Sequence, residues 1–140
     1  MNGIDSSITV FALDPTTSEH TKARDAIIRL REWALTPTVV HEVYHSLVFK
    51  RGMSPKDARS KIRALVGDGR TNFINITRVI SLYSLDLATE FRLGGRDSLI
   101  AGCYMRSGVE SILTHDGDLL RLGKLRFKGR QVAFTDPLAA

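Results

Sequence analysis

Hydrophobic positions along the chain follow two patterns, one with the spacing of a helix and one made of short apolar runs. Apolar residues three and four positions apart predict helices over residues 18–31, 37–51, 55–66, 78–93 and 97–107. Short apolar runs predict strands from the start of the chain to Asp5 and over residues 34–36, 72–76, 111–114 and 131–134. Strands and helices therefore alternate along the chain.

Polar residues and glycines at the expected helix ends support these boundaries. The segment Ser54-Pro55-Lys56-Asp57 supplies a capping serine, a proline at the first helical position and an acid in the first turn. Thr77 can cap the helix that follows it, and Gly94-Gly95 ends that helix before Asp97 begins the next. Three of the five predicted helices thus have a sequence signal at their start.

The alternation of short strands with longer helices predicts the fold class. Parallel neighbours in a sheet need crossover connections, which helices of ten or more residues provide. We expect an α/β protein, a three-layer αβα sandwich with a mainly parallel five-stranded sheet. Residues 6–13 leave two interpretations open, because β-branched and aromatic side chains favour a strand there while a strand ending at Asp5 would leave them in a helix.

Length and composition fit one folded unit, so we expect a single domain over residues 1–140. The 43% hydrophobic content is enough for a core without disulfides, and Cys103 is the only cysteine, in an apolar segment. No run approaches the roughly 20 apolar residues of a membrane span, and the first residues lack the pattern of a signal peptide. We therefore expect a cytoplasmic protein with no membrane association.

The net charge of +5 favours polyanionic partners, and the basic residues are clustered. Either cluster alone is typical of a solvated surface, whereas two clusters on either side of a group of acids would favour a phosphate-binding rim. The first cluster consists of Lys50, Arg51, Lys56, Arg59, Lys61 and Arg63, and the second of Arg121, Lys124, Arg126, Lys128 and Arg130.

Acidic residues lie where the predicted strands end, which is where open parallel sheets bind their ligands. Asp5 and Asp116 follow strands, Glu42 lies in the helix after the second strand, and Asp97 lies in the first turn of its helix. Each acid alone could be a helix cap or an exposed charge. Four of them at one edge of a sheet would repel one another unless cations were bound, and their oxygens suit Mg²⁺ or Mn²⁺.

With this order of acids the chain resembles a PIN domain and, within that family, a VapC-type toxin ribonuclease. The resemblance covers almost the whole chain. It depends on Asp5-Ser6-Ser7, on Glu42 early in its helix, on the segment Arg96-Asp97-Ser98-Leu99-Ile100-Ala101, and on Ile112-Leu113-Thr114-His115-Asp116-Gly117-Asp118-Leu119.

The resemblance implies a function as well as a fold. It implies an endoribonuclease that depends on Mg²⁺ or Mn²⁺, forms homodimers and is inhibited by a partner antitoxin. Its metal site would be built from Asp5, Glu42, Asp97 and Asp116 as catalytic residues, with Asp118 reaching the metal through water and with Ser7 and Thr114 in support. Basic residues near this site that would bind the nucleic acid are Arg96, Arg121, Lys124 and Arg126.

Two other interpretations stay open at this point. The segment His41-Glu42-Val43-Tyr44-His45 matches the H-E-x-x-H pattern of zinc peptidases, although no further glutamate occurs before Glu90 to serve as a third ligand. A non-catalytic module that binds nucleic acid or an antitoxin would use the basic charge and leave the acids without a role.

Overall fold

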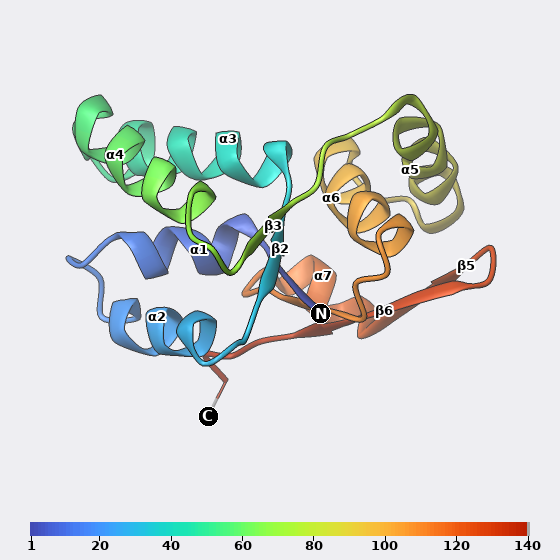
Figure 1. Ribbon diagram of the computed structural model, residues 1–140. Helices are drawn as coiled ribbons and strands as arrows, with labels where there is room; N and C mark the ends of the chain where they lie inside the picture. The colour runs from blue at the N-terminus through green and yellow to red at the C-terminus, as the bar shows by residue number, and fades with distance from the viewer. Residues whose placement is uncertain (140) are drawn as a thin grey trace.

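The computed structural model describes residues 1–139, and its centre is a six-stranded sheet (Figure 1). The strands are β1 (Asn2–Ile4), β2 (Trp33–Leu35), β3 (Thr71–Phe73), β4 (Ser111–Leu113), β5 (Lys124–Phe127) and β6 (Arg130–Thr135). Their order across the sheet is β3-β2-β1-β4-β6-β5, and all neighbours are parallel except β5 and β6. The switch point lies between β1 and β4, so the chain segments that leave these strands start side by side.

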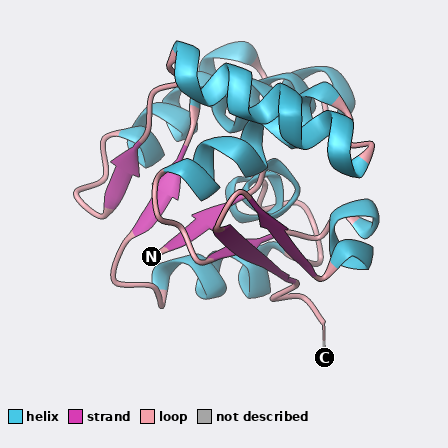
Figure 2. Cartoon of the chain, turned by 90° about the vertical axis from the view of Figure 1, so that its right-hand side faces the viewer, coloured by secondary structure: helices cyan, strands magenta, loops and turns pink. Residues whose placement is uncertain are grey.

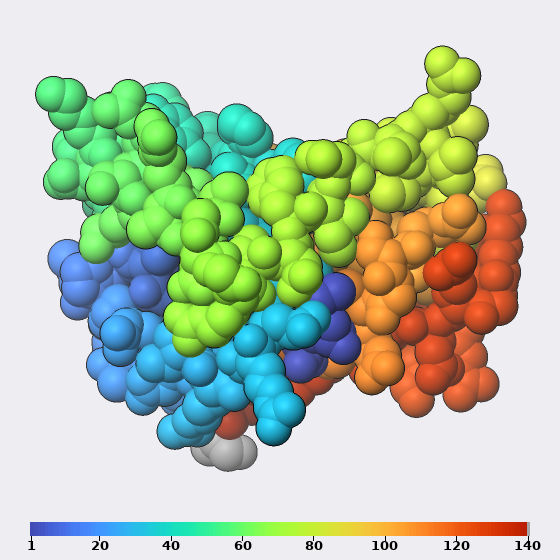
Figure 3. All heavy atoms as spheres, in the orientation of Figure 1, coloured from blue at the N-terminus to red at the C-terminus, as the bar shows by residue number. Residues whose placement is uncertain are grey.

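Helices cover both faces of the sheet, as Figure 2 shows. They are α1 (Ser6–Leu13), α2 (His20–Ile28), α3 (Pro37–His45), the π-helical turn η1 (Ser46–Lys50), α4 (Pro55–Val66), α5 (Arg78–Phe91), α6 (Gly95–Arg106) and α7 (Gly117–Leu122). On the face seen in Figure 3, α4 lies at the left and the start of α5 forms the upper right corner. No helix within residues 1–139 is both long and apolar enough to cross a membrane.

The predicted fold class is confirmed, but the predicted number of strands is wrong, because the sheet has six strands instead of five. The additional strand is β5, which pairs with β6 through a tight hairpin. Its turn contains Lys128 at φ 48° and Gly129 at φ 77°, the left-handed pair that matches the twist of hairpin strands. This strand carries two residues of the second basic cluster, Lys124 and Arg126, and its apolar alternation is limited to Leu125 and Phe127.

The structure also settles residues 6–13, which form helix α1. Asp5 caps this helix, since its Oδ1 accepts a hydrogen bond of 2.8 Å from the Ser6 amide. Ile8 and Val10 are buried in the core, where packing outweighs the preference of β-branched residues for strands. A three-residue β1 followed at once by a helix places Asp5 between the two.

Two predicted helix starts agree with the observed caps, whereas α6 begins at Gly95, two residues before Asp97. Ser54 Oγ accepts from the Asp57 amide at 3.1 Å, and Thr77 Oγ1 accepts from the Ile80 amide at 3.2 Å. The helix expected over residues 37–51 is α3 continued by η1, and π-helical turns of this kind occur frequently at functional sites.

A buried tyrosine contacts both of the neighbouring strands β1 and β2. The hydroxyl of Tyr104, on α6, lies 2.7 Å from the carbonyl oxygen of Ile4 and 3.2 Å from that of Ala34. Its ring packs on Gly3, where a Cβ would come within 2.6 Å of ring carbon Cδ2. Only glycine therefore allows α6 to approach β1 this closely, directly beside Asp5.

Candidate active site

Asp5 is the most enclosed carboxylate of the sheet edge, with 4% of its surface exposed. It follows β1, and its amide donates to the carbonyl oxygen of Leu113 at 3.0 Å, which ties it to β4. Thr114 Oγ1 donates to Asp5 Oδ2 at 2.7 Å, and Ser7 Oγ donates to the same oxygen at 3.2 Å. The two hydroxyls predicted to support the site thus hold Asp5 in place.

Asp116 is held by the same threonine. Its amide donates to Thr114 Oγ1 at 3.0 Å, so one hydroxyl joins Asp5 to the segment that carries Asp116. Asp116 also caps α7, because its Oδ1 accepts from the amides of Asp118 and Leu119. A capping role and a place in the acid group are therefore compatible for this residue.

Glu42 and Asp97 complete the group from two helices, α3 and α6. Glu42 Oε1 accepts a long hydrogen bond of 3.4 Å from Ser6 Oγ, and its Oε2 lies 3.6 Å from a guanidinium nitrogen of Arg96. Asp97 lies in the first turn of α6 and is half-buried. The contacts of Glu42 are thus longer than those of Asp5, and the Asp97 carboxylate has no hydrogen bond or ion pair within residues 1–139.

Three of the four carboxylates have pKa values that their surroundings raise. Burial raises the pKa of Asp5, Glu42 and Asp97 above the ordinary value of each. Negative neighbours add to this effect: Asp116 raises the pKa of Asp5 and of Asp97, and Asp5 raises the pKa of Glu42 and of Asp97. Arg96 opposes the shift at Glu42 and Asp97 by favouring their charged forms.

A divalent cation would relieve this repulsion, and the donors have the oxygen chemistry that Mg²⁺ or Mn²⁺ requires. Over residues 1–139 no three His, Cys, Asp or Glu side chains are already gathered closely enough to hold an ion. Side chains would therefore have to turn toward the cation. Glu42 and Asp97 are only half-buried, and the contacts of Glu42 are long. The donor set fits a hard cation on chemical grounds.

A family model for the PIN domain matches residues 4–125, which contain all four acids. The chain belongs to the PIN domain family. No curated protein matches it by sequence. Among solved structures, VapC20 of Mycobacterium tuberculosis, described as a toxin that cleaves the sarcin–ricin loop, is similar with a TM-score of 0.74 at 14% identity, over 88% of this chain and 95% of that one.

Toxin–antitoxin complexes are similar to this PIN domain as well. A DNA-bound VapBC from Salmonella typhimurium has a TM-score of 0.70 at 13% identity, over 97% of each chain. A toxin–antitoxin complex from Klebsiella pneumoniae has a TM-score of 0.68 at 18% identity, over the whole of both chains. At these identities the likeness is one of fold, and it agrees with the predicted VapC-type architecture.

Asp118 is separate from the other four acids in this PIN domain. Its side chain is exposed and forms an ion pair with Arg121, one turn further along α7. Its backbone amide donates to Asp116 Oδ1, but among the residues described its carboxylate contacts none of the other four acids. Its proposed contact through water stays a prediction.

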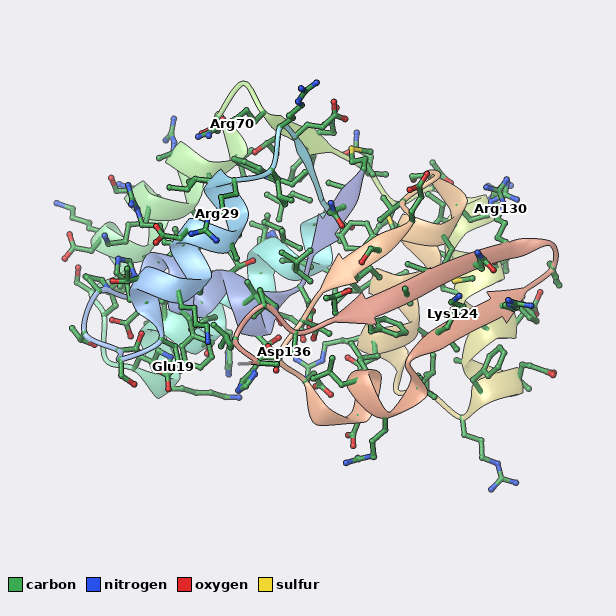
Figure 4. All side chains as sticks on the ribbon, turned by 90° about the horizontal axis from the view of Figure 1, so that it is seen from below. Glu19, Arg29, Arg70, Lys124, Arg130 and Asp136 are labelled. Atoms are coloured by element: carbon green, nitrogen blue, oxygen red, sulfur yellow. The ribbon has the colours of Figure 1, made fainter. Side chains whose placement is uncertain are left out.

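The basic residues predicted to bind nucleic acid differ in position. Arg96 lies at the acid group, and Arg121 lies on α7, which Asp116 begins. Lys124 pairs with Ala133, which pairs in turn with the first residue of β4, and Arg126 lies further toward the hairpin. Figure 4 shows Lys124 on this hairpin side of the molecule. The register thus places Lys124 and Arg126 toward the end of the sheet where β4 begins, whereas Asp5 and Asp116 follow the carboxyl ends of β1 and β4.

The two histidines of the H-E-x-x-H pattern lie at the surface of α3. His45 packs against the ring of Phe49 with centroids 5.1 Å apart, and His41 is exposed. Glu42 interacts with Arg96 and the other acids, as its contacts above show. Zinc-peptidase geometry, with a third protein ligand beside the two histidines, is absent from residues 1–139.

The sequence contained signals for two site residues that were not predicted. Ser6 donates a hydrogen bond to Glu42. It lies between Asp5 and Ser7, which were both predicted as site residues. Asp136 directly follows β6, and its Oδ2 lies 2.9 Å from His115 Nδ1. The rule that polar residues after strands line the site would have found Asp136 had the end of β6 been placed one residue later.

Proposed function

We propose that this PIN domain is a metal-dependent endoribonuclease and the toxin of a toxin–antitoxin pair. The observation that carries the proposal is the buried carboxylate of Asp5, which two hydroxyls fix near three further acids. The charge of Asp116 raises the pKa of Asp5 and of Asp97, and the charge of Asp5 raises the pKa of Glu42 and of Asp97. An arrangement that destabilises its own charged form is expected where a cation binds.

Asp5, Glu42, Asp97 and Asp116 would hold the Mg²⁺ or Mn²⁺. When bound, such an ion lowers the pKa of a water molecule and stabilises charge on the leaving oxygen of a phosphodiester. The protein's part is to orient the carboxylates through Thr114 and Ser7, and to offer the exposed guanidinium of Arg96 to a phosphate.

The substrate and partner in this proposal are extended from the structural neighbours. VapC20 is described as a toxin that cleaves the sarcin–ricin loop, and other neighbours are complexes of a toxin with its antitoxin. We infer RNA as the substrate, an antitoxin protein as the inhibitor, and a homodimer as the assembly. The net charge of +5 is consistent with a polyanionic substrate.

Cleavage of RNA by the purified protein with Mg²⁺ or Mn²⁺ tests the proposal. We expect cleavage with either metal, none in excess EDTA, and a loss of at least about 100-fold in Asp5→Asn and Asp97→Asn, because loss of a direct ligand should exceed the effect of losing its orienting partners. Circular dichroism and thermal melting must show that both variants stay folded. Asp57→Asn, an exposed acid on α4, serves as the matched control.

Three outcomes would contradict the assignment. Undiminished RNA cleavage in EDTA would exclude a metal-dependent reaction. Zinc-restored peptidase activity that His45→Ala removes would support the H-E-x-x-H interpretation. Salt-sensitive RNA binding without products under any metal would support a non-catalytic module.

A further inference from the structure

We propose that the cleft between α1 and the α3–η1 segment binds the RNA strand beside the acids, and that Phe49 together with His45 stacks an unpaired base of that strand. This inference rests on the proposed ribonuclease function and names the residues that select a single-stranded substrate. It gives a role to the histidine of the H-E-x-x-H pattern that the acid site leaves unused.

The cleft has a volume of about 310 Å³ and opens next to the acid group. Helices α1 and α3 form its sides, and they lie next to each other (Figure 1). Glu42 belongs both to the cleft and to the four acids, so an RNA strand bound in the cleft would continue directly to the metal site. The hydroxyls of Ser6, Ser7 and Ser46 add neutral donors to its lining.

Basic side chains give the cleft the charge that a phosphodiester backbone requires. Lys50, Arg51 and Arg96 line it, together with His45 and His115. Arg51 is held in position by Asp14, with nitrogen and oxygen 3.5 Å apart, and by the ring of Phe11, 5.0 Å from its guanidinium carbon. Lys50 has no ion-pair partner among residues 1–139, which leaves its full charge for a phosphate.

Phe49 is an exposed aromatic residue next to two residues that line this basic cleft, His45 and Lys50. With 71% of its surface exposed, it is the most exposed large apolar side chain among the residues described. It precedes Lys50 in η1, and its ring lies against that of His45 at an interplanar angle of 34°. The pair therefore forms an aromatic surface directly beside the phosphate-binding groups.

An unpaired base is the occupant that these neighbours favour. Proteins that bind single-stranded nucleic acid combine a basic groove with aromatic side chains on which bases stack. In a duplex the bases already stack on one another and have no free face for Phe49. An acidic peptide would match the charge of the cleft but would gain less from an exposed aromatic ring.

Binding measured without cleavage tests this proposal. The protein carries Asp97→Asn so that it binds RNA without cleaving it. Each probe is a single-stranded RNA of about ten nucleotides with one 2-aminopurine, placed at a different position in each probe. Fluorescence anisotropy measures binding, and fluorescence intensity reports stacking of the labelled base. Stacking on an aromatic ring is worth about 1–3 kcal/mol per base, so Phe49→Ala should weaken binding about 5- to 150-fold. It should also restore the fluorescence that one probe position loses on binding.

Matched variants separate stacking from charge and from loss of apolar surface. Leu82→Ala removes a side chain that is 57% exposed on α5, away from the cleft, and should leave binding unchanged. Phe49→Trp should retain tight binding. Lys50→Ala should weaken binding of every probe alike and lower the salt dependence by about one phosphate contact.

Two results would overturn the proposal. One is equal affinity and equal fluorescence in Phe49→Ala and Leu82→Ala. The other is unchanged RNA binding together with a shift from dimer to monomer in Phe49→Ala, which would assign Phe49 to a protein interface. The wild type could cleave no RNA under any metal while Phe49→Ala still lost RNA binding. The nuclease proposal would then fail, but the proposal that this cleft binds RNA would stand.

Discussion

The group of four acids, Asp5, Glu42, Asp97 and Asp116, has two unlike ends. At the closed end, Asp5 and Asp116 share the hydroxyl of Thr114, and Asp5 is 4% exposed. At the open end, Glu42 and Asp97 come from two separate helices and are half-buried, and the contacts of Glu42 are 3.4 Å or longer. One end is preorganised by short hydrogen bonds, and the other is free to adjust.

This difference matters for how a cation would bind. A fixed carboxylate at the closed end costs little entropy on binding, because its orientation is already set by the fold. Carboxylates with weak contacts at the open end can turn to complete the coordination of an ion and of its waters. We therefore expect the closed end to determine metal affinity through its hydroxyls and the open end to respond to the metal by moving.

The largest effect outside the acids themselves is expected at Thr114, which is fully buried. Thr114→Val keeps the shape of the side chain and removes the donor to Asp5 and the acceptor for the Asp116 amide. Loss of such an orienting partner typically lowers metal affinity 10- to 100-fold, and we expect a loss of about that size. Calorimetric titration with Mn²⁺ measures it.

Thr114→Ser is the matched control, because it keeps the hydroxyl and removes only the methyl group. Its Mn²⁺ affinity should stay within a few-fold of the wild type. Equal affinities in Thr114→Val and wild type would show that the closed end is not preorganised by this hydroxyl.

The closed end could be predicted from the sequence because it depends on strand ends. Asp5 and Asp116 follow β1 and β4, and parallel neighbours in a sheet end at the same edge. The caps of α4 and α5 were predictable for a similar reason, since Ser54 and Thr77 act on amides only three residues away. Local chemistry and one topological rule are sufficient for these features.

The cleft proposed to bind RNA, between α1 and the α3–η1 segment, could not be predicted, because it depends on packing between distant segments. Arg51 lies in the cleft because η1 turns the chain back over α1, where Asp14 and Phe11 hold the guanidinium. Nothing in the local sequence specifies a π-helical turn at the end of α3. Strand β5 was missed for a related reason, since its four residues acquire their strand geometry from pairing with β6.

A smaller effect is expected on the pH dependence of stability without metal. The pKa values of Asp5, Glu42 and Asp97 are raised in the folded state, so folded protein binds more protons than unfolded protein above the ordinary values of 3.8 for Asp and 4.5 for Glu. Stability from these groups is therefore lost as the pH rises through the raised pKa values. We expect the melting temperature in EDTA to fall by a few degrees between pH 4 and pH 7.

The lowered pKa values of Asp14 and Asp68 act in the opposite direction, but below the ordinary value of 3.8, so they do not mask this fall. Mn²⁺ at pH 7 should reverse it, because the ion binds the charged form. Asp97→Asn should flatten the slope, whereas Asp57→Asn on α4 should not. If the melting temperature fell equally with pH in the wild type, Asp97→Asn and Asp57→Asn, the repulsion proposed for the open end would be absent.

The smallest effect is expected from Asp118, which belongs to neither end. Asp118→Asn removes an exposed carboxylate that is paired with Arg121, and exposed pairs of this kind contribute about 0–1 kcal/mol. Its RNA cleavage rate and Mn²⁺ affinity should stay within about fivefold of the wild type, a difference of about 1 kcal/mol, because its carboxylate contacts only Arg121 among the residues described. The matched variant Asp116→Asn, two residues earlier, should lose most of its activity, because Asp116 acts electrostatically on both Asp5 and Asp97. Comparable losses in the two variants would place Asp118 in the metal site through water and extend that site along α7.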